Sequence, residues 1–211
     1  IWSKKGSCYM DPVEFFKKNS YVYIPGLVSP ELTNFIYNYL ILKSCTNRDF
    51  SDGENNSFQY IRHCYADLNT ETLSSILLDK ISNVVQKKLC PTYTYSRVYT
   101  HGEILKPHTD RESCEYSITV NFGGDAWSIY MGEANKDRDL DNGFNIKGEV
   151  TLKPGDGVIY MGEKLVHWRN QLKGDHCAQA FLHYIDMEGP HYPEWAYDKR
   201  YNIGYQKIAK T

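Results

Sequence analysis

Two histidines and one aspartate have the residue types and the spacing to hold a metal ion. His108 and Asp110 flank Thr109, and His167 lies in a separate segment farther along the chain. Side chains at positions i and i+2 of an extended chain point the same way, and Pro107 directly before the pair favours extended backbone. Two imidazoles and one carboxylate are the protein donors of non-haem iron(II) sites that leave the other coordination positions open. Zinc accepts the same donors, so donor type alone does not select the metal.

The alternative to a metal site is a surface turn at residues 108–110 and a hydrogen-bonded core histidine at His167. The second segment favours the site, because His167 follows a Pro154-Gly155-Asp156 turn and an apolar stretch. A strand formed by that stretch could return beside the first pair. The other histidines lack comparable partners in the sequence; they are His63, His101, His176, His183 and His191.

Composition narrows the class of protein. The 211 residues, of which 41% are hydrophobic and 24% charged, predict one soluble globular domain over 1–211. A formal net charge of −2 gives no reason to expect a nucleic-acid partner. No apolar run approaches the roughly 20 residues that span a bilayer, so no membrane partner is expected. The six cysteines form no CxxC pair, which argues against a zinc ribbon or a thioredoxin motif. An extracellular disulfide framework is an alternative at this count, but in a chain of this length we expect reduced thiols and a cytoplasmic location.

Helix signals come first along the chain and strand signals follow. Three helices are expected over 11–19, 29–40 and 70–89, the last ended by Pro91, with a strand at 21–24 between the first two. From Tyr93 onward the period changes to two, and glycine-containing turns separate short segments. Strands are expected over 93–100, 116–122, 127–131, 149–152, 157–161 and 178–185.

This order predicts an α+β fold in which helices support a jelly roll. We expect a mainly helical support region at 1–91, a jelly-roll catalytic core at 92–186 and a C-terminal extension at 187–211.

At this point the chain resembles the iron(II)- and 2-oxoglutarate-dependent oxygenases, in their prolyl-hydroxylase-like branch. The matching residues are Tyr21–Leu27, Tyr99, Gly102, Leu105, Pro107-His108-Thr109-Asp110, Leu152-Lys153-Pro154-Gly155-Asp156, His167-Trp168-Arg169 and Gln179-Ala180-Phe181-Leu182-His183-Tyr184. The family fold is a double-stranded β-helix, or jelly roll, with supporting helices, which agrees with the strand pattern.

The resemblance implies an enzyme, a non-haem iron dioxygenase. His108, Asp110 and His167 would be the catalytic iron(II) ligands, and 2-oxoglutarate would be the cosubstrate, with ascorbate as a candidate reductant. Decarboxylation of 2-oxoglutarate would be coupled to hydroxylation of an unactivated C–H bond with dioxygen as the oxidant.

The resemblance leaves the cosubstrate contacts open. In this branch an arginine or lysine about nine or ten positions after the second histidine binds the far carboxylate, and here His176 lies nine positions on. His176 is therefore expected to make this contact, with Arg169 or Lys173 as alternatives. Tyr99 would donate its hydroxyl to the cosubstrate, or be a packed strand aromatic. Thr119 faces either the pocket or solvent. Arg111, directly after Asp110, would anchor that carboxylate, contact the substrate or be a surface charge.

Three functions remain open at this stage. The first is hydroxylation of a peptidyl proline or a related side chain. The second is hydroxylation of a free amino acid or other small metabolite, with residues 48–56 and 133–145 as a lid. The third is a non-catalytic jelly-roll binding module with a vestigial iron site, favoured by the unusual residue at position 176.

Overall fold

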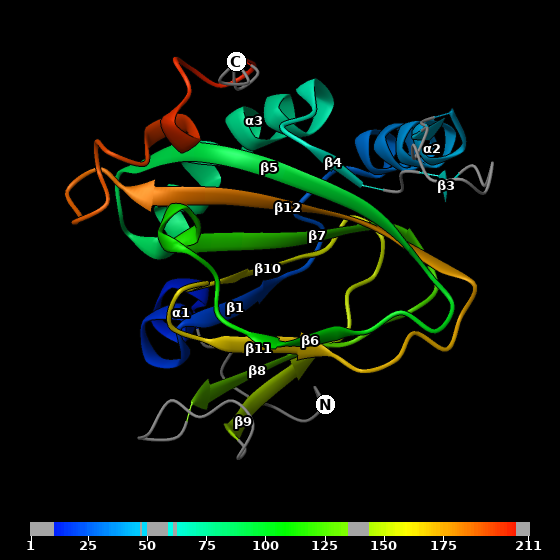
Figure 1. Ribbon diagram of the computed structural model, residues 1–211. Coiled ribbons are helices and arrows are strands. Elements are labelled where there is room, and N and C mark those ends of the chain that lie inside the picture. The colour runs from blue at the N-terminus through cyan, green and yellow to red at the C-terminus, as the bar shows by residue number, and fades with distance from the viewer. Residues whose placement is uncertain (1–10, 47, 50–58, 61–62, 135–143, 206–211) are drawn as a thin grey trace.

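The protein folds as two facing antiparallel sheets with helices on one outer side, as the computed structural model shows (Figure 1). The structure describes residues 11–46, 48–49, 59–60, 63–134 and 144–205. The major sheet has the order β1-β10-β7-β12-β5-β4, and the minor sheet has the order β6-β11-β8-β9. Facing sheets with these antiparallel crossovers are the predicted jelly roll, so that expectation is confirmed.

The major sheet contains the longest strands of the chain. Its members are β1 (Tyr21–Ile24), β4 (His63–Tyr65), β5 (Leu89–Thr100), β7 (Tyr116–Gly124), β10 (Gly157–Tyr160) and β12 (His176–Asp186). The minor sheet consists of β6 (Leu105–His108), β8 (Ile129–Ala134), β9 (Phe144–Val150) and β11 (Val166–Arg169). A separate pair joins β2 (Arg48–Asp49) and β3 (Gln59–Tyr60). The region expected to be mainly helical support, residues 1–91, also contributes β1 and β4, which are the two edge strands of the major sheet.

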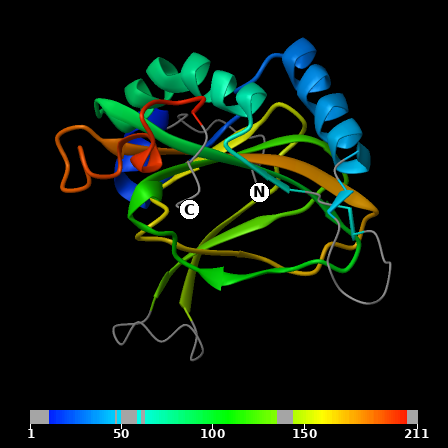
Figure 2. The ribbon, with the colours of Figure 1, turned by 45° about the horizontal axis from the view of Figure 1, so that its top comes forward.

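Three helices support the major sheet: α1 (Pro12–Asn19), α2 (Pro30–Thr46) and α3 (Leu68–Val85). Figure 2 shows α2 and α3 across the outer face of that sheet. The largest apolar cluster fills this layer, with Leu73, Leu77 and Ile81 of α3 packed with Ala180 and Leu182 of β12. Alternation along β12 leaves its other side chains, such as Phe181 and His183, facing the minor sheet.

The third helix ends earlier than the sequence pattern predicted. Its C-cap is Gln86, whose φ of 55° is left-handed and whose N–H bonds to Ser82 O. Pro91 instead lies inside β5, where it pairs in register with Tyr184. The expectation that Pro91 ends this helix is therefore wrong, because a left-handed cap already satisfies the last carbonyls.

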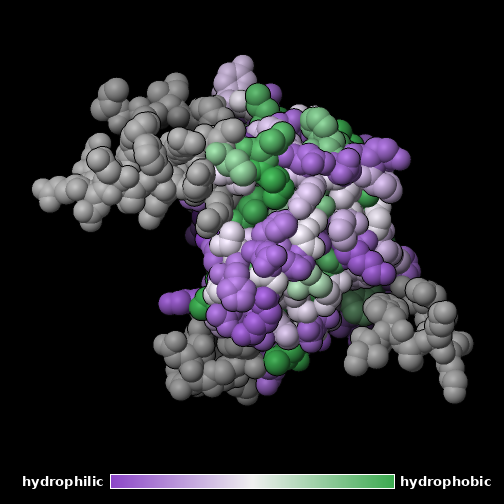
Figure 3. Space-filling view, turned by 90° about the vertical axis from the view of Figure 1, so that its right-hand side faces the viewer, coloured by the Kyte–Doolittle hydropathy of each residue, from purple (hydrophilic) through white to green (hydrophobic). Residues whose placement is uncertain are grey.

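The surface on the α2 side carries some exposed apolar residues. Figure 3 shows hydrophobic side chains gathered at the helical layer, while most of that face is hydrophilic. Phe35 and Leu42 of α2 are 58% and 67% exposed. This surface lies outside the barrel, on the far side of the major sheet from the minor sheet.

Two smaller findings complete the fold. Among the described residues, Cys45, Cys64, Cys90, Cys114 and Cys177 are free cysteines. Within the described residues, none of the helices combines the length and the apolar character needed to cross a bilayer.

Candidate metal centre

Adjacent strands of the minor sheet bring the two histidines together. His108 ends β6 and His167 lies in β11, and the two residues are register partners in this antiparallel pair. Their rings are 4.2 Å apart between centroids. Asp110 follows β6, where its N–H donates to Gly162 O at 2.9 Å. Residues distant in sequence therefore converge because a strand returns beside the first pair.

The three side chains face one point. His108 Nε2 lies 3.7 Å and His167 Nε2 lies 3.5 Å from Asp110 Oδ1. Potential ligand atoms of the three residues all lie within 4.8 Å of one another. The His167 side chain is 3% exposed and that of Asp110 15%, whereas the His108 side chain is 38% exposed. The cluster is thus buried on one side and open on the other.

Backbone carbonyls orient both imidazoles. His108 Nδ1 lies 2.8 Å from Lys106 O, and His167 Nδ1 lies 3.0 Å from Leu165 O. A carbonyl accepts only, so Nδ1 carries the proton in each ring and the Nε2 lone pair is free. Such outer hydrogen bonds fix the tautomer of metal-binding histidines. Both Nε2 atoms therefore present lone pairs to the same side as Asp110 Oδ1.

The second oxygen of Asp110 is held by a buried network that the sequence did not reveal. Ser117 Oγ lies 2.8 Å from Asp110 Oδ2 and 2.9 Å from His183 Nδ1. The serine proton goes to the carboxylate, and His183 Nδ1–H donates to Ser117 Oγ. The sequence pattern gave His183 no partner. It did offer one indication, because His183 lies two residues after Phe181 on β12 and both side chains therefore point into the barrel.

Local electrostatics keep these groups in the states that a metal site needs. Burial and the neighbouring His167 lower the pKa of His108, and burial lowers the pKa of His183 to about 4, so both are neutral near pH 7. Burial opposes ionisation of Asp110, but the interactions with His167, His183 and Ser117 outweigh it and hold its pKa well below 3.8. The site therefore presents an ionised carboxylate beside the neutral imidazole of His108, which are the states that metal ligation requires.

Gly162 is required for the close packing behind Asp110. A Cβ at this position would collide with Asp110 Oδ2 and the Cys114 carbonyl, and would lie 2.7 Å from Ser117 Oγ. Any larger residue would push the carboxylate away from the imidazoles.

A cavity of about 180 Å³ opens on the cluster between the two sheets. Its lining consists of Tyr93, Tyr95, Tyr99, Leu105, His108, Asp110, Tyr160, His167, Phe181 and His183. Besides the metal cluster and His183, the lining consists of four tyrosines, Leu105 and Phe181, so aromatic rings form most of the wall and the tyrosines add hydroxyl groups.

Arg169 is a buried cation without an acidic partner among the described residues. It follows His167 by two positions on β11 and therefore points to the same side of the strand. Arg169 is 1% exposed; Nη1 donates to Trp127 O, while Nε and Nη2 have no hydrogen-bond partner there. A buried, half-satisfied guanidinium is costly unless an anion joins it.

Two tyrosines interact with this guanidinium. Tyr99 and Tyr160 both interact electrostatically with Arg169 and both line the cavity. Tyr160 is 2% exposed, its ring lies 4.8 Å from that of His167, and its hydroxyl lies 3.3 Å from Thr119 Oγ1. Thr119 thus lies in the barrel interior beside Tyr160. Tyr160 was missed in the sequence, where it was counted only as part of an apolar strand.

The structure does not bring His176 to the cavity. His176 Nε2 lies 2.8 Å from Tyr37 Oη, and its ring stacks on that of Tyr37 at 6.1 Å. Tyr37 belongs to α2, so His176 faces the helical layer, on the opposite side of β12 from Phe181. The expected contact of His176 with a cosubstrate therefore does not fit this geometry, because strand alternation turns the side chain away. Lys173 is exposed and bonds Gln171.

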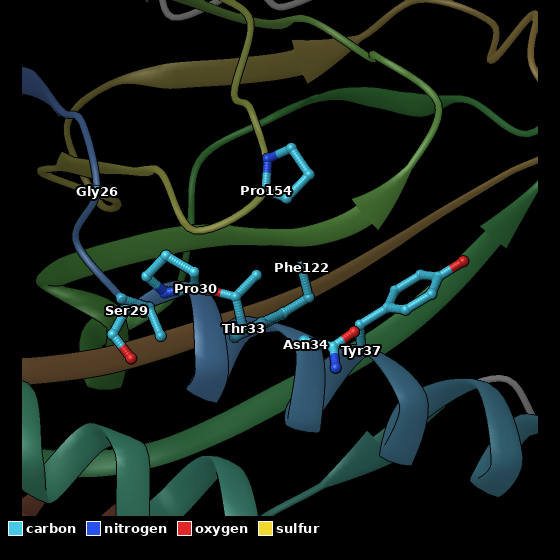
Figure 4. A pocket seen from close by; sticks show the side chains of 9 residues that line it. Gly26, Ser29, Pro30, Thr33, Asn34, Tyr37, Phe122 and Pro154 are labelled. Carbon is cyan, nitrogen blue, oxygen red and sulfur yellow. The ribbon is translucent and has the colours of Figure 1, made fainter.

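A larger cavity lies away from the candidate metal cluster and contains fewer groups that could take part in a reaction (Figure 4). It measures about 340 Å³ and lies between the start of α2 and the turn at Pro154. Among the described residues that line it, none is a histidine, cysteine, aspartate or glutamate. Its size alone does not make it the site, because it offers no metal ligand or acid–base group.

The comparisons with known proteins agree with this architecture. No family model matches the chain, and no curated protein sequence does. Solved structures similar to it include EctD from S. alaskensis with 2-oxoglutarate and 5-hydroxyectoine (12% identity, 95% of this chain and 86% of that chain, TM-score 0.64).

Two further matches are HygX from Streptomyces hygroscopicus with nickel and 2-oxoglutarate (14% identity, 86% of this chain and 88% of that chain, TM-score 0.59) and a Pseudomonas putida prolyl-4-hydroxylase (10%, 82% and 96%, 0.57). At these identities the likeness defines the fold: the chain has the double-stranded β-helix of the 2-oxoglutarate-dependent oxygenases, with a His-Asp-His cluster inside it.

Proposed function

We propose that the protein is an iron(II)- and 2-oxoglutarate-dependent dioxygenase that hydroxylates an unactivated C–H bond. His108, Asp110 and His167 would hold the metal through two Nε2 atoms and a carboxylate oxygen. When bound, iron(II) and 2-oxoglutarate supply the oxidising chemistry, with dioxygen as the oxidant. The chain itself positions the ligands, neutralises the cosubstrate and excludes water.

The observation that carries the proposal is the unsatisfied guanidinium of Arg169. It lies on the same side of β11 as His167 and keeps two nitrogens without partners among the described residues. Arginine presents its N–H groups as a fork that matches a carboxylate. The far carboxylate of 2-oxoglutarate would satisfy those donors while its 2-oxo acid end reaches the metal. We therefore assign the cosubstrate anchor to Arg169, with Tyr99, Tyr160 and Thr119 beside it.

The residues on the rest of the cavity wall favour a substrate whose reacting group is uncharged. Tyr93, Tyr95 and Phe181 line it, and the nearby cations Arg97 and Arg111 are already paired with Glu103 and Asp198. A free amino acid would bring a carboxylate and an ammonium group, and each would need a partner of opposite charge. An aromatic wall instead suits a saturated ring or aliphatic side chain carried on a larger molecule.

We therefore favour a peptidyl proline or a similar side chain as the substrate. The likeness to a prolyl-4-hydroxylase supports this choice. The likeness to a structure that contains 5-hydroxyectoine keeps a small metabolite as the second candidate. The segments expected to form a lid, 48–56 and 133–145, lie mostly outside the described residues, so they do not help to choose between the two.

The experiment begins with metal-free protein under anaerobic conditions. Iron(II) and 2-oxoglutarate are added, and the weak visible charge-transfer absorbance of the chelate is recorded. Wild-type protein should show it, and Asp110→Ala should not. Asp156→Asn, a buried aspartate outside the cluster, should behave as wild type. Absence of the band in metal-loaded wild-type protein contradicts the proposal.

Turnover then separates the candidate functions. Proline-rich peptides and free amino acids are each incubated with the loaded enzyme, and products are screened for the mass of one added oxygen atom. Oxidation of peptides alone supports the first candidate, and oxidation of free amino acids alone supports the second. An enzyme of this kind forms some succinate from 2-oxoglutarate without substrate, by uncoupled turnover, whereas a non-catalytic module would form none.

A further inference from the structure

The C-terminal segment from Trp195 to Arg200 contains backbone that L-residues rarely adopt. Tyr197, Asp198 and Lys199 have φ values of 51°, 54° and 62°, all in the left-handed region. That conformation is disfavoured for an L-residue because its Cβ comes too close to the following carbonyl oxygen. Residues of this kind persist where surrounding contacts hold them, and they concentrate at functional sites. The contacts of this segment therefore show which parts of the protein it holds in place.

One set of contacts attaches the segment to the body of the protein. Arg200 Nη2 lies 2.5 Å from Glu71 Oε1 in α3 and 2.8 Å from Thr92 O in β5. The side chains of Arg200 and Glu71 are 0% and 2% exposed. A buried and fully hydrogen-bonded ion pair fixes geometry strongly, because loss of either partner leaves an uncompensated charge.

A second set of contacts leads toward the metal cavity. Asp198 is 0% exposed, and its carboxylate accepts from Arg111 Nη1 at 2.9 Å and from the Tyr65 hydroxyl. Arg111 directly follows the candidate ligand Asp110. The one carboxylate therefore joins the loop after the metal cluster to β4 at the edge of the major sheet.

Arg111 and Tyr65, which bind the Asp198 carboxylate, pack on the same ring. The Arg111 guanidinium lies 4.7 Å from the centroid of the Tyr93 ring, and the Tyr65 ring stacks on it at 5.1 Å. Tyr93 lines the cavity, packs on His183 at 4.6 Å, and places its hydroxyl 3.2 Å from Cys114 Sγ. The position of this cavity wall thus depends on two groups that Asp198 holds.

We infer that Asp198 is a positioning residue that fixes Tyr93, through Arg111 and Tyr65, as the wall against which the substrate side chain binds. The C-terminal segment is then part of the site, although none of its residues lines the cavity. The consequence for turnover rests on the proposed function, whereas the effect on Tyr93 and Cys114 does not.

The metal ligands have separate supports. Asp110 is held by Ser117 Oγ and by its own N–H on Gly162 O, and neither group contacts Asp198. Loosening Asp198 should therefore disturb the substrate wall much more than metal affinity, because the hydrogen bonds on Asp110 itself remain and only the ring contact between Tyr93 and His183 links the two networks.

The first test uses metal-free protein and the accessibility of Cys114. Tyr93 contacts this thiol, which is 2% exposed, so movement of the ring should open a path to it. Asp198→Asn should raise the rate of Cys114 alkylation by iodoacetamide about tenfold, as expected for a modest rise in local opening. Cys177 is 0% exposed at the far end of β12 and serves as the internal reference. Its alkylation rate should not change.

The matched control is Asp156→Asn. Asp156 is 6% exposed and accepts a tyrosine hydroxyl, from Tyr23 at 2.6 Å, but it lies at the start of β10. This variant should leave Cys114 as protected as in wild type. An unchanged Cys114 rate in Asp198→Asn overturns the inference. An equal rise at Cys114 and Cys177 would indicate general unfolding of this variant, and Tyr65→Phe then decides the inference.

A milder variant keeps the test valid if Asp198→Asn does not fold. Tyr65→Phe retains the ring on Tyr93 and removes only the hydroxyl bound to Asp198. It should raise Cys114 alkylation in the same direction by a smaller factor. A Cys114 rate equal to that of wild type in this variant counts against the inference.

The second test measures turnover. Asp198→Asn should raise the KM for the substrate that is to be hydroxylated about tenfold. It should also increase the number of succinate molecules formed per molecule of hydroxylated product, while Mn²⁺ affinity stays within about twofold. If Cys114 became accessible in this variant but KM and the ratio of succinate to product did not change, Asp198 would not be a residue that positions the substrate. If wild-type protein binds no metal and turns nothing over, the proposed function fails, but the alkylation test still decides the role of Asp198.

Discussion

Ser117 donates a hydrogen bond of 2.8 Å to Asp110 Oδ2, the oxygen that is turned away from the two imidazoles. The same hydroxyl lies 2.9 Å from His183 Nδ1. This arrangement leaves Oδ1 of the carboxylate to face His108 and His167. The aspartate therefore has one oxygen committed to the protein and one available to a metal ion.

Removal of that hydroxyl should weaken metal binding. Ser117→Ala is expected to reduce Mn²⁺ or Fe²⁺ affinity about tenfold or more, because outer hydrogen bonds to ligands typically contribute that much. Isothermal titration of the metal-free protein measures this directly. Ser74→Ala is the matched control, since Ser74 is equally buried and bonds Tyr184 on the helical side of the sheet. Equal metal affinity in wild type and Ser117→Ala would show that the network does not orient the ligand.

Arg169 and His176 give opposite predictions for cosubstrate binding. Arg169→Met should lower 2-oxoglutarate affinity of the Mn²⁺-loaded protein at least about 100-fold, since a charged hydrogen-bonding partner is lost. His176→Phe should change that affinity by less than about twofold, because His176 bonds Tyr37 in the helical layer. Titration calorimetry of both variants decides the anchor. The reverse result would restore His176 to the role expected from its sequence position.

The same arginine variant makes a prediction about stability. Arg169 is 1% exposed and lacks an anionic partner among the described residues, so it costs free energy in the protein without cosubstrate. Arg169→Met keeps the length of the side chain and should leave the melting temperature of the metal-free protein unchanged or raise it. A drop of more than about 3 °C, comparable to the loss of about 1 kcal/mol, would mean that the guanidinium is structurally satisfied.

His183 predicts how stability depends on pH. Burial lowers its pKa to about 4 from 6.5, so the unfolded chain binds a proton more readily between those values. The free energy of unfolding should therefore fall as pH drops from about 6.5 to about 4, by up to about 3 kcal/mol from this residue. Urea denaturation of the metal-free protein across that range gives the slope.

His183→Gln should make that slope shallower, while His101→Gln, at an exposed histidine, should keep it. A His183→Gln slope as steep as that of wild type would mean that other groups cause the acid sensitivity.

The sequence by itself determined the fold class and predicted the three residues of the candidate metal cluster. His108-Thr109-Asp110 carries its own geometry, because extended backbone places both side chains on one side. The turn and apolar strand before His167 similarly predicted a segment returning beside the first. Local patterns also predicted most helices and strands, since period and turn residues act over short distances.

Only the tertiary structure decided which residues surround that cluster. His176 and Arg169 were both candidates in the sequence, and strand alternation turned one toward α2 and the other into the barrel. Ser117, Tyr160 and His183 joined the site through pairing of β7, β10 and β12. Asp198 approaches Arg111 across 87 positions of sequence. Strand register and chain crossings set such contacts, and no local spacing encodes them.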